Sequence, residues 1–256
     1  MMLTNRYVSQ LARAGIILLS PLFLAGTASA GEEDCWPSRM GRTPSAPADA
    51  PLWRKAIEVA GIAPTTCGIA LRQLPHEPDT YVLYAENPVE YNVMDHQLVL
   101  LRKKADSFEV VARHRSAGNS YFFESFDFAP YTIRKGETAV GVRLQVQGPT
   151  IGGIYRCTRL VLFARVGSEL LPVFSATADQ YAEGNEVAYD EDTRFEKSGS
   201  ATFIMGKPDR SGYKRIVRKV GKHKMVFRRD GTEYSPLGDG EPGCIADRCY
   251  CQDEYK

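Results

Sequence analysis

A regular alternation of apolar and polar residues constrains this chain more than any other feature. In the segment AVGVRLQVQ (139–147), apolar side chains occupy every second position, and glycine or polar residues fill the positions between them. Successive side chains of a strand point to opposite faces, so this pattern is typical of a half-buried strand. Further strands are expected at YVLYA, HQLVLLRKK, FEVVARH, YRCTRLVLFARV, ELLPVFSA, KRIVRKV and KMVFRRD. The sequence therefore predicts an all-β body from about residue 69 onward.

A short motif recurs within this β-rich part. FARVGSELLPV (163–173) and FRRDGTEYSPL (227–237) share F-x-R-x-G-[ST]-E-x-x-P, and LVLLRKKADSFEVV (98–111) aligns with the segment that starts at residue 160. Each copy is typical of a hairpin with a tight turn, in which Gly167 and Gly231 would supply the positive φ. Common hairpin chemistry explains so short a match as well as a true repeat does. A repeat would favour an antiparallel β-sandwich or a small propeller-like array of hairpins.

One short helix is expected ahead of the strands. Asp49 can cap it, Pro51 is tolerated in its first turn, and Gly61 can end it, which predicts a helix over about residues 50–60. The predicted organisation is a signal peptide at 1–30, an irregular lead at 31–47, a single β-rich domain at 48–238 and a cysteine-rich tail at 239–256.

The first 30 residues have the three parts of a cleavable secretory signal. Arg6 and Arg13 precede an apolar run of about 11 residues, and small residues end the segment at Ala30. The run is too short to span a membrane, because spanning takes about 20 residues. No later segment approaches that length. We therefore expect cleavage near Ala30 and a soluble mature protein, beginning at Gly31, in the oxidising periplasm.

All six cysteines follow this signal, and an even number of cysteines in an oxidising compartment indicates disulfide bonds. The candidates are Cys35, Cys67, Cys157, Cys244, Cys249 and Cys251. The tail spacing C-x4-C-x-C has no nearby histidine and lacks the paired ligands of a zinc site. Cys249 and Cys251 are too close for an easy mutual bond. At least one of them is therefore expected to bond outside 244–251 and to staple the tail to the body.

Charge and motifs exclude several function classes. Removing residues 1–30 takes away two arginines and leaves 30 basic and 31 acidic residues, a formal charge of −1, which gives no global attraction to nucleic acid. The chain has no G-x-S-x-G elbow, no H-E-x-x-H motif and no phosphate loop, and its four histidines are scattered. We therefore assign no catalytic residue, no metal ligand and no cofactor.

Two segments depart from this balance of charge. EGNEVAYDEDTRFE (183–196) is predicted to be a solvated acidic loop, since it lacks the ligand order of a calcium loop. YKRIVRKVGKHKMVFRRD (213–230) is predicted to be an exposed or edge hairpin whose charges block aggregation. The alternative is a docking surface for an acidic protein or for anionic lipid headgroups. The partner-binding candidates are Asp190, Glu191, Asp192, Arg215, Arg218, Lys219, Lys222, Lys224, Arg228 and Arg229.

Three segments of the β-rich part carry a resemblance to known proteins. FDFAPYTIRKGETAVGVR, RLVLFARVGSELLPVF and VFRRDGTEY resemble exported, largely uncharacterised bacterial all-β proteins, over roughly residues 90–237. Some small periplasmic proteins of this kind act as immunity partners of secreted antibacterial lipases or other toxins. The resemblance implies a protein-binding role, and it transfers no site residue.

Two function classes remain open. The first is a non-enzymatic periplasmic protein-binding module, an inhibitor or immunity protein with a protein partner in the envelope. The alternative is an envelope hydrolase or glycan-binding protein with a site built from dispersed residues, because catalytic triads are recognised by geometry rather than by spacing. A pocket with converging carboxylates, or with a histidine beside a serine, would favour the alternative.

Overall fold

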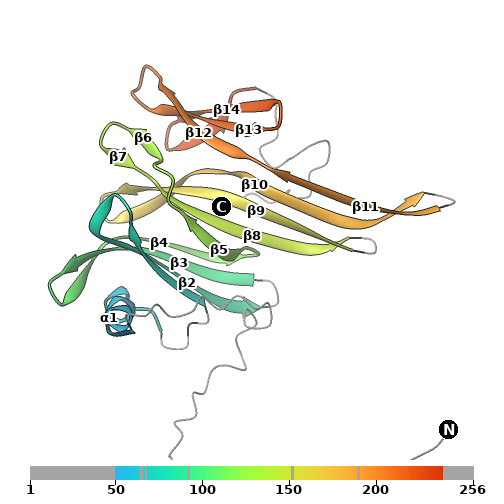
Figure 1. Cartoon of the computed structure of the whole chain (residues 1–256). Helices are drawn as coiled ribbons and strands as arrows, with labels where there is room; N and C mark the ends of the chain where they lie inside the picture. Colours follow the sequence, from blue (N-terminus) through green and yellow to red (C-terminus); the bar gives the residue numbers. More distant parts are fainter. Residues whose placement is uncertain are drawn as a thin grey trace, which may run out of the picture.

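The computed structural model describes residues 50–63, 66, 68–90, 93–150, 153–188 and 191–238. The predicted signal peptide, lead and tail lie outside these residues. Five of the six cysteines therefore also lie outside them: Cys35, Cys67, Cys244, Cys249 and Cys251. The described part contains one short helix, α1 (Ala50–Ala60), and strands β1 to β15, so the chain is mostly β, as the alternation predicts (Figure 1). No described helix is long and apolar enough to cross a membrane.

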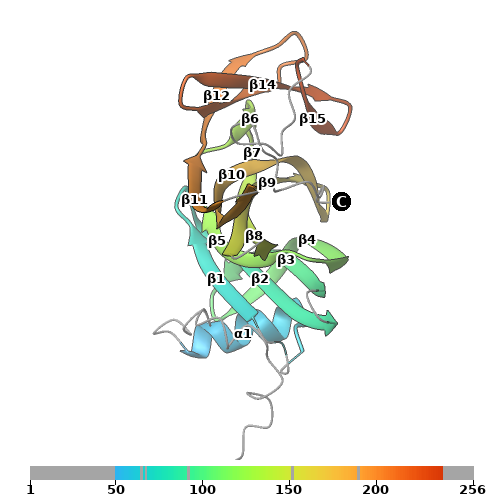
Figure 2. The same ribbon diagram turned by 90° about the vertical axis from the view of Figure 1, so that its right-hand side faces the viewer.

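A nine-stranded sheet forms the body and curls until it is nearly a barrel (Figure 2). In sheet order its strands are β1 (Gly68–Leu74), β2 (Glu77–Glu90), β3 (Val93–Lys104), β4 (Ser107–Asn119), β10 (Glu169–Ala188), β9 (Gly153–Val166), β8 (Val140–Thr150) and β5 (Phe122–Asp127). The ninth strand, β11 (Glu191–Ser200), pairs with the far part of β10. Neighbouring strands are antiparallel except β4 and β10, which meet in parallel at Arg113 and Glu169.

A four-stranded sheet packs against the outside of this body. Its strands are β12 (Thr202–Pro208), β13 (Lys214–Val220), β14 (His223–Asp230) and β15 (Glu233–Pro236). A ribbon of β6 (Thr132–Arg134) and β7 (Glu137–Thr138) lies next to it in both views (Figures 1 and 2). Ile216 and Phe227 of the small sheet are fully buried against Leu160 and Leu162 of β9.

The alternation on each strand divides the apolar side chains between two faces of the large sheet. Leu98, Val142 and Val161 point to the inside of the curved sheet and form one buried cluster. Their neighbours on the other face form two more clusters, one beneath the small sheet and one beneath α1. The core is therefore built on both faces of a single sheet.

The predicted helix has the expected bounds and end. Ala56 and Ala60 lie on the face of the helix that packs against β3 and β4, and both are fully buried. Gly61 has φ +67, its N–H donates to Glu58, and the N–H of Ile62 donates to Ile57. This pair of bonds is a Schellman motif, which satisfies carbonyl groups at the helix end.

The three related segments form three two-residue hairpins, β3–β4, β9–β10 and β14–β15. The first turn residue has positive φ in each of them: +42° at Ala105, +63° at Gly167 and +60° at Gly231. In the second and third hairpins an arginine Nε also donates to the glycine carbonyl, Arg165 to Gly167 and Arg229 to Gly231. A sandwich or a propeller is not confirmed, because the first two hairpins belong to one curved sheet and the third to the small sheet.

A side chain joins β5, the strand at one end of the curved sheet, to β2, the second strand from the other end. The edge strand β5 pairs with β8 on one side. On its other side the N–H of Phe123 donates to Oε2 of Glu86, on β2, at 2.8 Å. Tyr84 stacks on Phe123 with ring centroids 4.5 Å apart. We call this junction the seam; a carboxylate and an aromatic pair hold it in place of a strand ladder.

The prediction of an acidic loop is wrong, because these residues form a two-stranded ribbon. β10 continues past the curved sheet, and β11 pairs with it from Asp179–Ser200 to Ala188–Glu191 (Figure 1). A ribbon tolerates charged side chains on both faces when water reaches them, so charge alone does not distinguish it from a loop.

The cysteine framework is described at one position. Cys157 lies on β9, is completely buried among the inward-facing residues, and is disulfide-bonded. Its partner lies outside the described residues, so the predicted staple of the tail stays a prediction.

Candidate functional site

The basic segment forms the hairpin β13–β14, as predicted; of the two expected positions, exposed or at a sheet edge, the edge position is not found. β12 pairs with β13, and β15 pairs with β14, so both basic strands are inner strands of the small sheet. The flanking strands have seven and four residues, and neither alternates apolar with polar residues, which is why their pattern in the sequence is weak.

The structure separates the basic candidates by exposure. The exposed ones are Arg215, Lys222, Lys224 and Arg228, whereas Lys219 and Arg229 are half-buried. Arg218 is only 3% exposed, because it lies on the same face as the buried Ile216. Burial, with a smaller contribution from the charge of Arg159, lowers the pKa of Arg218 to about 10. The expectation that Arg218 belongs to a charged surface is therefore not supported.

Two of the three acidic candidates lie at the tip of the ribbon. Asp190 lies outside the described residues. Glu191 and Asp192 begin β11, opposite Ala188 and Val187. The structure therefore does not bring the acidic candidates into the basic hairpin.

Three of the basic candidates line a concavity of about 730 Å³ at one end of the small sheet. The residues around it are Pro208, Asp209, Arg210, Ser211, Arg215, Arg228 and Arg229. We call this concavity the arginine site. It lies where β12 ends, the turn 209–213 follows, and β13 begins.

Arg229 is the most firmly held of its four arginines. Its Nε donates to the carbonyl of Gly231 at 3.2 Å, and its Cζ lies 4.7 Å from the ring centroid of Tyr213 and 5.8 Å from that of Tyr234. Tyr234 is itself fixed, because its hydroxyl donates to the carbonyl of Lys214 at 2.8 Å. Nη1 of Arg229 is buried and has no hydrogen-bond partner among the described residues. The guanidinium is therefore positioned by aromatic rings and not by an acid.

The turn beside Arg229 is closed by its own hydrogen bonds. Asp209 Oδ1 accepts bonds from the N–H and the hydroxyl of Ser211, at 2.9 and 2.5 Å. The hydrogen bond from the Ser211 side chain is the main cause that lowers the pKa of Asp209. The N–H of Asp209 donates to Tyr213, and that of Gly212, with φ +83°, donates to Asp209. The carboxylate of Asp209 therefore holds Ser211 in the turn, and the backbone N–H of Asp209 holds Tyr213.

The arginine site has more positive than negative charge. Four arginines and one acidic residue, Asp209, line it, and none of the four arginines forms an ion pair with another residue of the described part. Asp209 lies close enough to Arg228 for the charge of Arg228 to help lower its pKa. Such an excess of fixed positive charge favours the binding of an anion.

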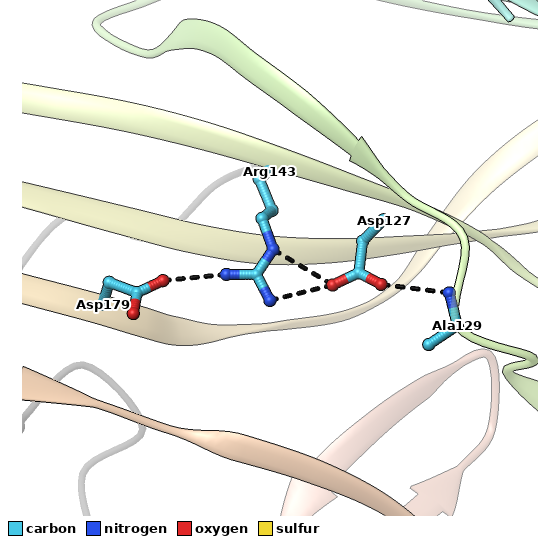
Figure 3. A network of polar contacts seen from close by, with 4 residues as sticks. All are labelled: Asp127, Ala129, Arg143 and Asp179. Carbon is cyan, nitrogen blue, oxygen red and sulfur yellow. Dashed lines mark hydrogen bonds and ion pairs between the residues drawn. The ribbon is translucent and has the colours of Figure 1, made fainter.

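Arg143, on β8, is an arginine whose charge is balanced by two carboxylates of neighbouring strands. Its Nε and Nη2 donate to Asp127 at 3.0 and 2.9 Å, and its Nη1 donates to Asp179 at 2.8 Å (Figure 3). The second oxygen of Asp127 accepts the N–H of Ala129 at 3.1 Å. The network ties β5 and β10 to β8. The four arginines of the arginine site have no equivalent of these carboxylates.

A row of polar side chains lies on the inner face of the curved sheet. The register places Glu86, His96 and Ser116 side by side on β2, β3 and β4. Glu86 and His96 are buried, and Nδ1 of His96 is hydrogen-bonded to the hydroxyl of Tyr84. Burial raises the pKa of Glu86 to about 7, against a smaller opposite effect of the Phe123 hydrogen bond.

This row has the residue types of a hydrolytic triad in a different arrangement. In a Ser–His–acid triad the acid accepts the Nδ1 proton of the histidine. Here the hydroxyl of Tyr84 is hydrogen-bonded to Nδ1 of His96, and Oε2 of Glu86 accepts a hydrogen bond from the N–H of Phe123. Sequence reasoning missed the row, because strand pairing alone brings together residues ten and twenty positions apart.

The described residues contain no group of three or more histidine, cysteine, aspartate or glutamate side chains that could hold a metal ion. Sequence reasoning also missed Asp209, Arg210, Ser211 and Tyr213. The signal was present in the segment PDRSGYKR, where Asp-x-Ser-Gly is typical of a tight turn and precedes the basic strand.

Comparison with models of protein families found no match, and comparison with curated protein sequences found none. The site therefore has to be interpreted from its own chemistry. It can attract and hold an anionic group by charge and by a pre-positioned arginine.

Proposed function

We propose that the chain is a non-enzymatic binding protein of the bacterial periplasm that captures an acidic protein partner through the arginine site. An inhibitor or immunity protein of a secreted antibacterial toxin, such as a lipase, is the role that we favour. The carrying observation is the set of four guanidinium groups that have no ion-pair partner in the described part of the chain and converge on one concavity.

The two kinds of arginine suggest two contributions to binding. Exposed charges such as Arg215 and Arg228 raise the rate of association and select partners. A pre-positioned arginine packed against tyrosine rings is typical of residues that carry binding energy and slow dissociation. Arg229 has these properties, and it would pair with a carboxylate of the partner once that group displaces water from the site.

The test is a kinetic comparison with a partner recovered from envelope extracts by pulldown. We expect Arg215→Glu/Arg228→Glu to slow association and to weaken its dependence on salt, and Arg229→Ala to speed dissociation. Arg165→Glu is the matched control, since Arg165 makes the same bond to a turn glycine in the β9–β10 hairpin. Arg218 is left unchanged because it is buried. Equal rates for all variants, or turnover of a substrate by the pure protein, would contradict the proposal.

Hydrolysis is the second candidate function, and the row Glu86–His96–Ser116 is the observation that favours it. The mature protein would then cleave a short-chain p-nitrophenyl ester, and Ser116→Ala would abolish that activity. An activity that Ser116→Ala leaves unchanged, or the absence of any activity above that of buffer, rejects this candidate.

Export and disulfide bonding complete the proposal. The mature protein would begin at Gly31 in the periplasm, with the cysteine-rich tail stapled to the body. Amino-terminal sequencing of protein from the envelope fraction tests the first statement, and an intact Met1 would contradict it.

A further inference from the structure

The outer face of the small sheet carries a row of apolar side chains on β12, β13 and β14, and the row ends at Leu237, the residue after β15. Ile204 lies opposite Val217, Val217 lies opposite Val226, and the N–H of Leu237 donates to Val226 at 2.7 Å. Ile204 and Leu237 are 39% and 46% exposed, and the two valines are partly exposed. We call these four residues the apolar stripe.

The alternation of side chains shows which way the stripe points. Ile216 and Phe227 are the chain neighbours of Val217 and Val226, and both are completely buried against the curved sheet. Successive side chains of a strand point to opposite faces, so the stripe points away from the core. These four apolar residues therefore do not stabilise the described core.

Basic residues flank the stripe on both sides. Lys219 lies directly opposite Lys224, one step along the strands from Val217 and Val226 on the outer face. Arg215 and Arg228 occupy the same face on the other side, where they also line the arginine site. Like charges opposite each other destabilise a sheet. The apolar stripe therefore lies between two pairs of basic residues, Lys219 with Lys224 and Arg215 with Arg228.

This arrangement is that of a protein-binding surface. Interfaces have an apolar centre and a polar, charged rim, whereas residues that insert into a lipid surface gather on one side of an amphipathic element and leave the charges on the other. Here the apolar and charged residues share one face of a sheet. The charged residues next to the stripe are basic on both sides, and the acidic pair Asp230 and Glu233 lies one step farther along β14 and β15.

We propose that the outer face of the small sheet docks a protein whose surface has an apolar patch with carboxylates on both sides. This inference rests on the proposed function and extends it, since the arginine site becomes one end of a larger docking surface. The apolar stripe supplies burial, and the flanking cations fix the orientation of the partner.

The experiment places a photo-reactive residue, benzoylphenylalanine, at position 217 of the exported chain and identifies what it cross-links in the envelope. The cross-linked protein is then purified, and its affinity is measured for the double variant Ile204→Ser/Leu237→Ser. We expect a loss of about tenfold or more, because both side chains would lose buried area in the complex. Lys219→Glu/Lys224→Glu should slow association.

The matched control is Val89→Ser/Val166→Ser, which removes from the curved sheet two apolar residues that are even more exposed, at 56% and 52%. It should leave the affinity unchanged, and thermal unfolding should show that all variants are folded. If the stripe variant binds as tightly as this control while the arginine variants still weaken binding, the inference is wrong and the proposed function stands. If neither set of variants matters, both fail.

Other occupants of the face are outcomes of the same experiment. Flotation with phosphatidylglycerol vesicles that Ile204→Ser/Leu237→Ser abolishes would assign the face to lipid and overturn the inference. A concentration-dependent dimer that the same variant dissociates would assign the face to a second copy of the chain, with the same consequence.

Discussion

One carboxyl group decides how the curved sheet closes. Glu86 is 6% exposed, accepts the N–H of Phe123 across the seam, and packs so closely against Gly68 that a Cβ there would lie 2.6 Å from its Cγ. Because burial raises the pKa of Glu86 to about 7, this group changes its charge in the physiological range. The seam is therefore the place where the stability of this fold depends on pH.

The pH dependence has a definite sign. The pKa of Glu86 rises from 4.5 to about 7 on folding, so between these values the folded chain binds more protons than the unfolded chain. This contribution to stability is complete below pH 4.5 and is lost as the pH rises through 7. The difference is about 3 kcal/mol in the free energy of unfolding.

Glu86→Gln should remove this loss, because the amide oxygen can still accept the N–H of Phe123 and has no charge to bury. Urea unfolding between pH 4.5 and 8 measures it, and we expect the variant to exceed the parent most at pH 8. Glu109→Gln is the control, since Glu109 is exposed and pairs with Lys104. An unchanged pH profile in Glu86→Gln would show that another group is responsible.

At the level of elements, the alternation predicted the strands that carry the core, and the recurring motif predicted the hairpins. Gly167 and Gly231 have the expected positive φ, and Ala105 adopts it in the third copy. The ribbon β10–β11 and the flanking strands β12 and β15 could not be predicted, because pairing with a neighbour stabilises them. β11 and β15 show no alternation of apolar residues, and the three apolar residues of β12 follow one another at 203–205.

Two substitutions in the hairpin turns should have opposite effects on the stability of the protein. Ala105→Gly should stabilise the protein by up to about 1 kcal/mol, since an L-residue is strained at φ +42°, with part of the gain offset by chain entropy. Gly167→Ala should destabilise it by about 1 kcal/mol through φ alone, because no atom lies within 4 Å of an added Cβ. Urea unfolding measures both, and changes of the same sign would contradict the role of these turns.

For the whole molecule, the sequence placed the basic candidates on one hairpin but could not show which of them are accessible. Arg218 and Lys219 are adjacent, yet one is buried beneath the small sheet and the other faces outward. The arginine site depends on the turn 209–213 and on Tyr234, which approach only when the four strands pair. The charges along the sequence do not show which arginines are accessible or which segments the strand pairing brings together.

The disulfide framework gives a prediction at the same scale. Cys157 is buried and bonded, so reduction should lower the free energy of unfolding by about 2–4 kcal/mol. Peptide mapping under non-reducing conditions should join Cys249 or Cys251 to a cysteine outside residues 244–251. Bonds internal to the tail alone, or free thiols, would refute the staple.

The long strand β10 also has a mechanical consequence. It pairs with β9 along most of its length, then with β11, and the chain continues from β11 directly into the small sheet. Tension that a bound partner exerts on that sheet would therefore pass along β11 and β10 and load the β9–β10 ladder along its strands. Many hydrogen bonds would resist such shear together, whereas the hairpins of the small sheet, pulled apart at their open ends, would yield one bond at a time.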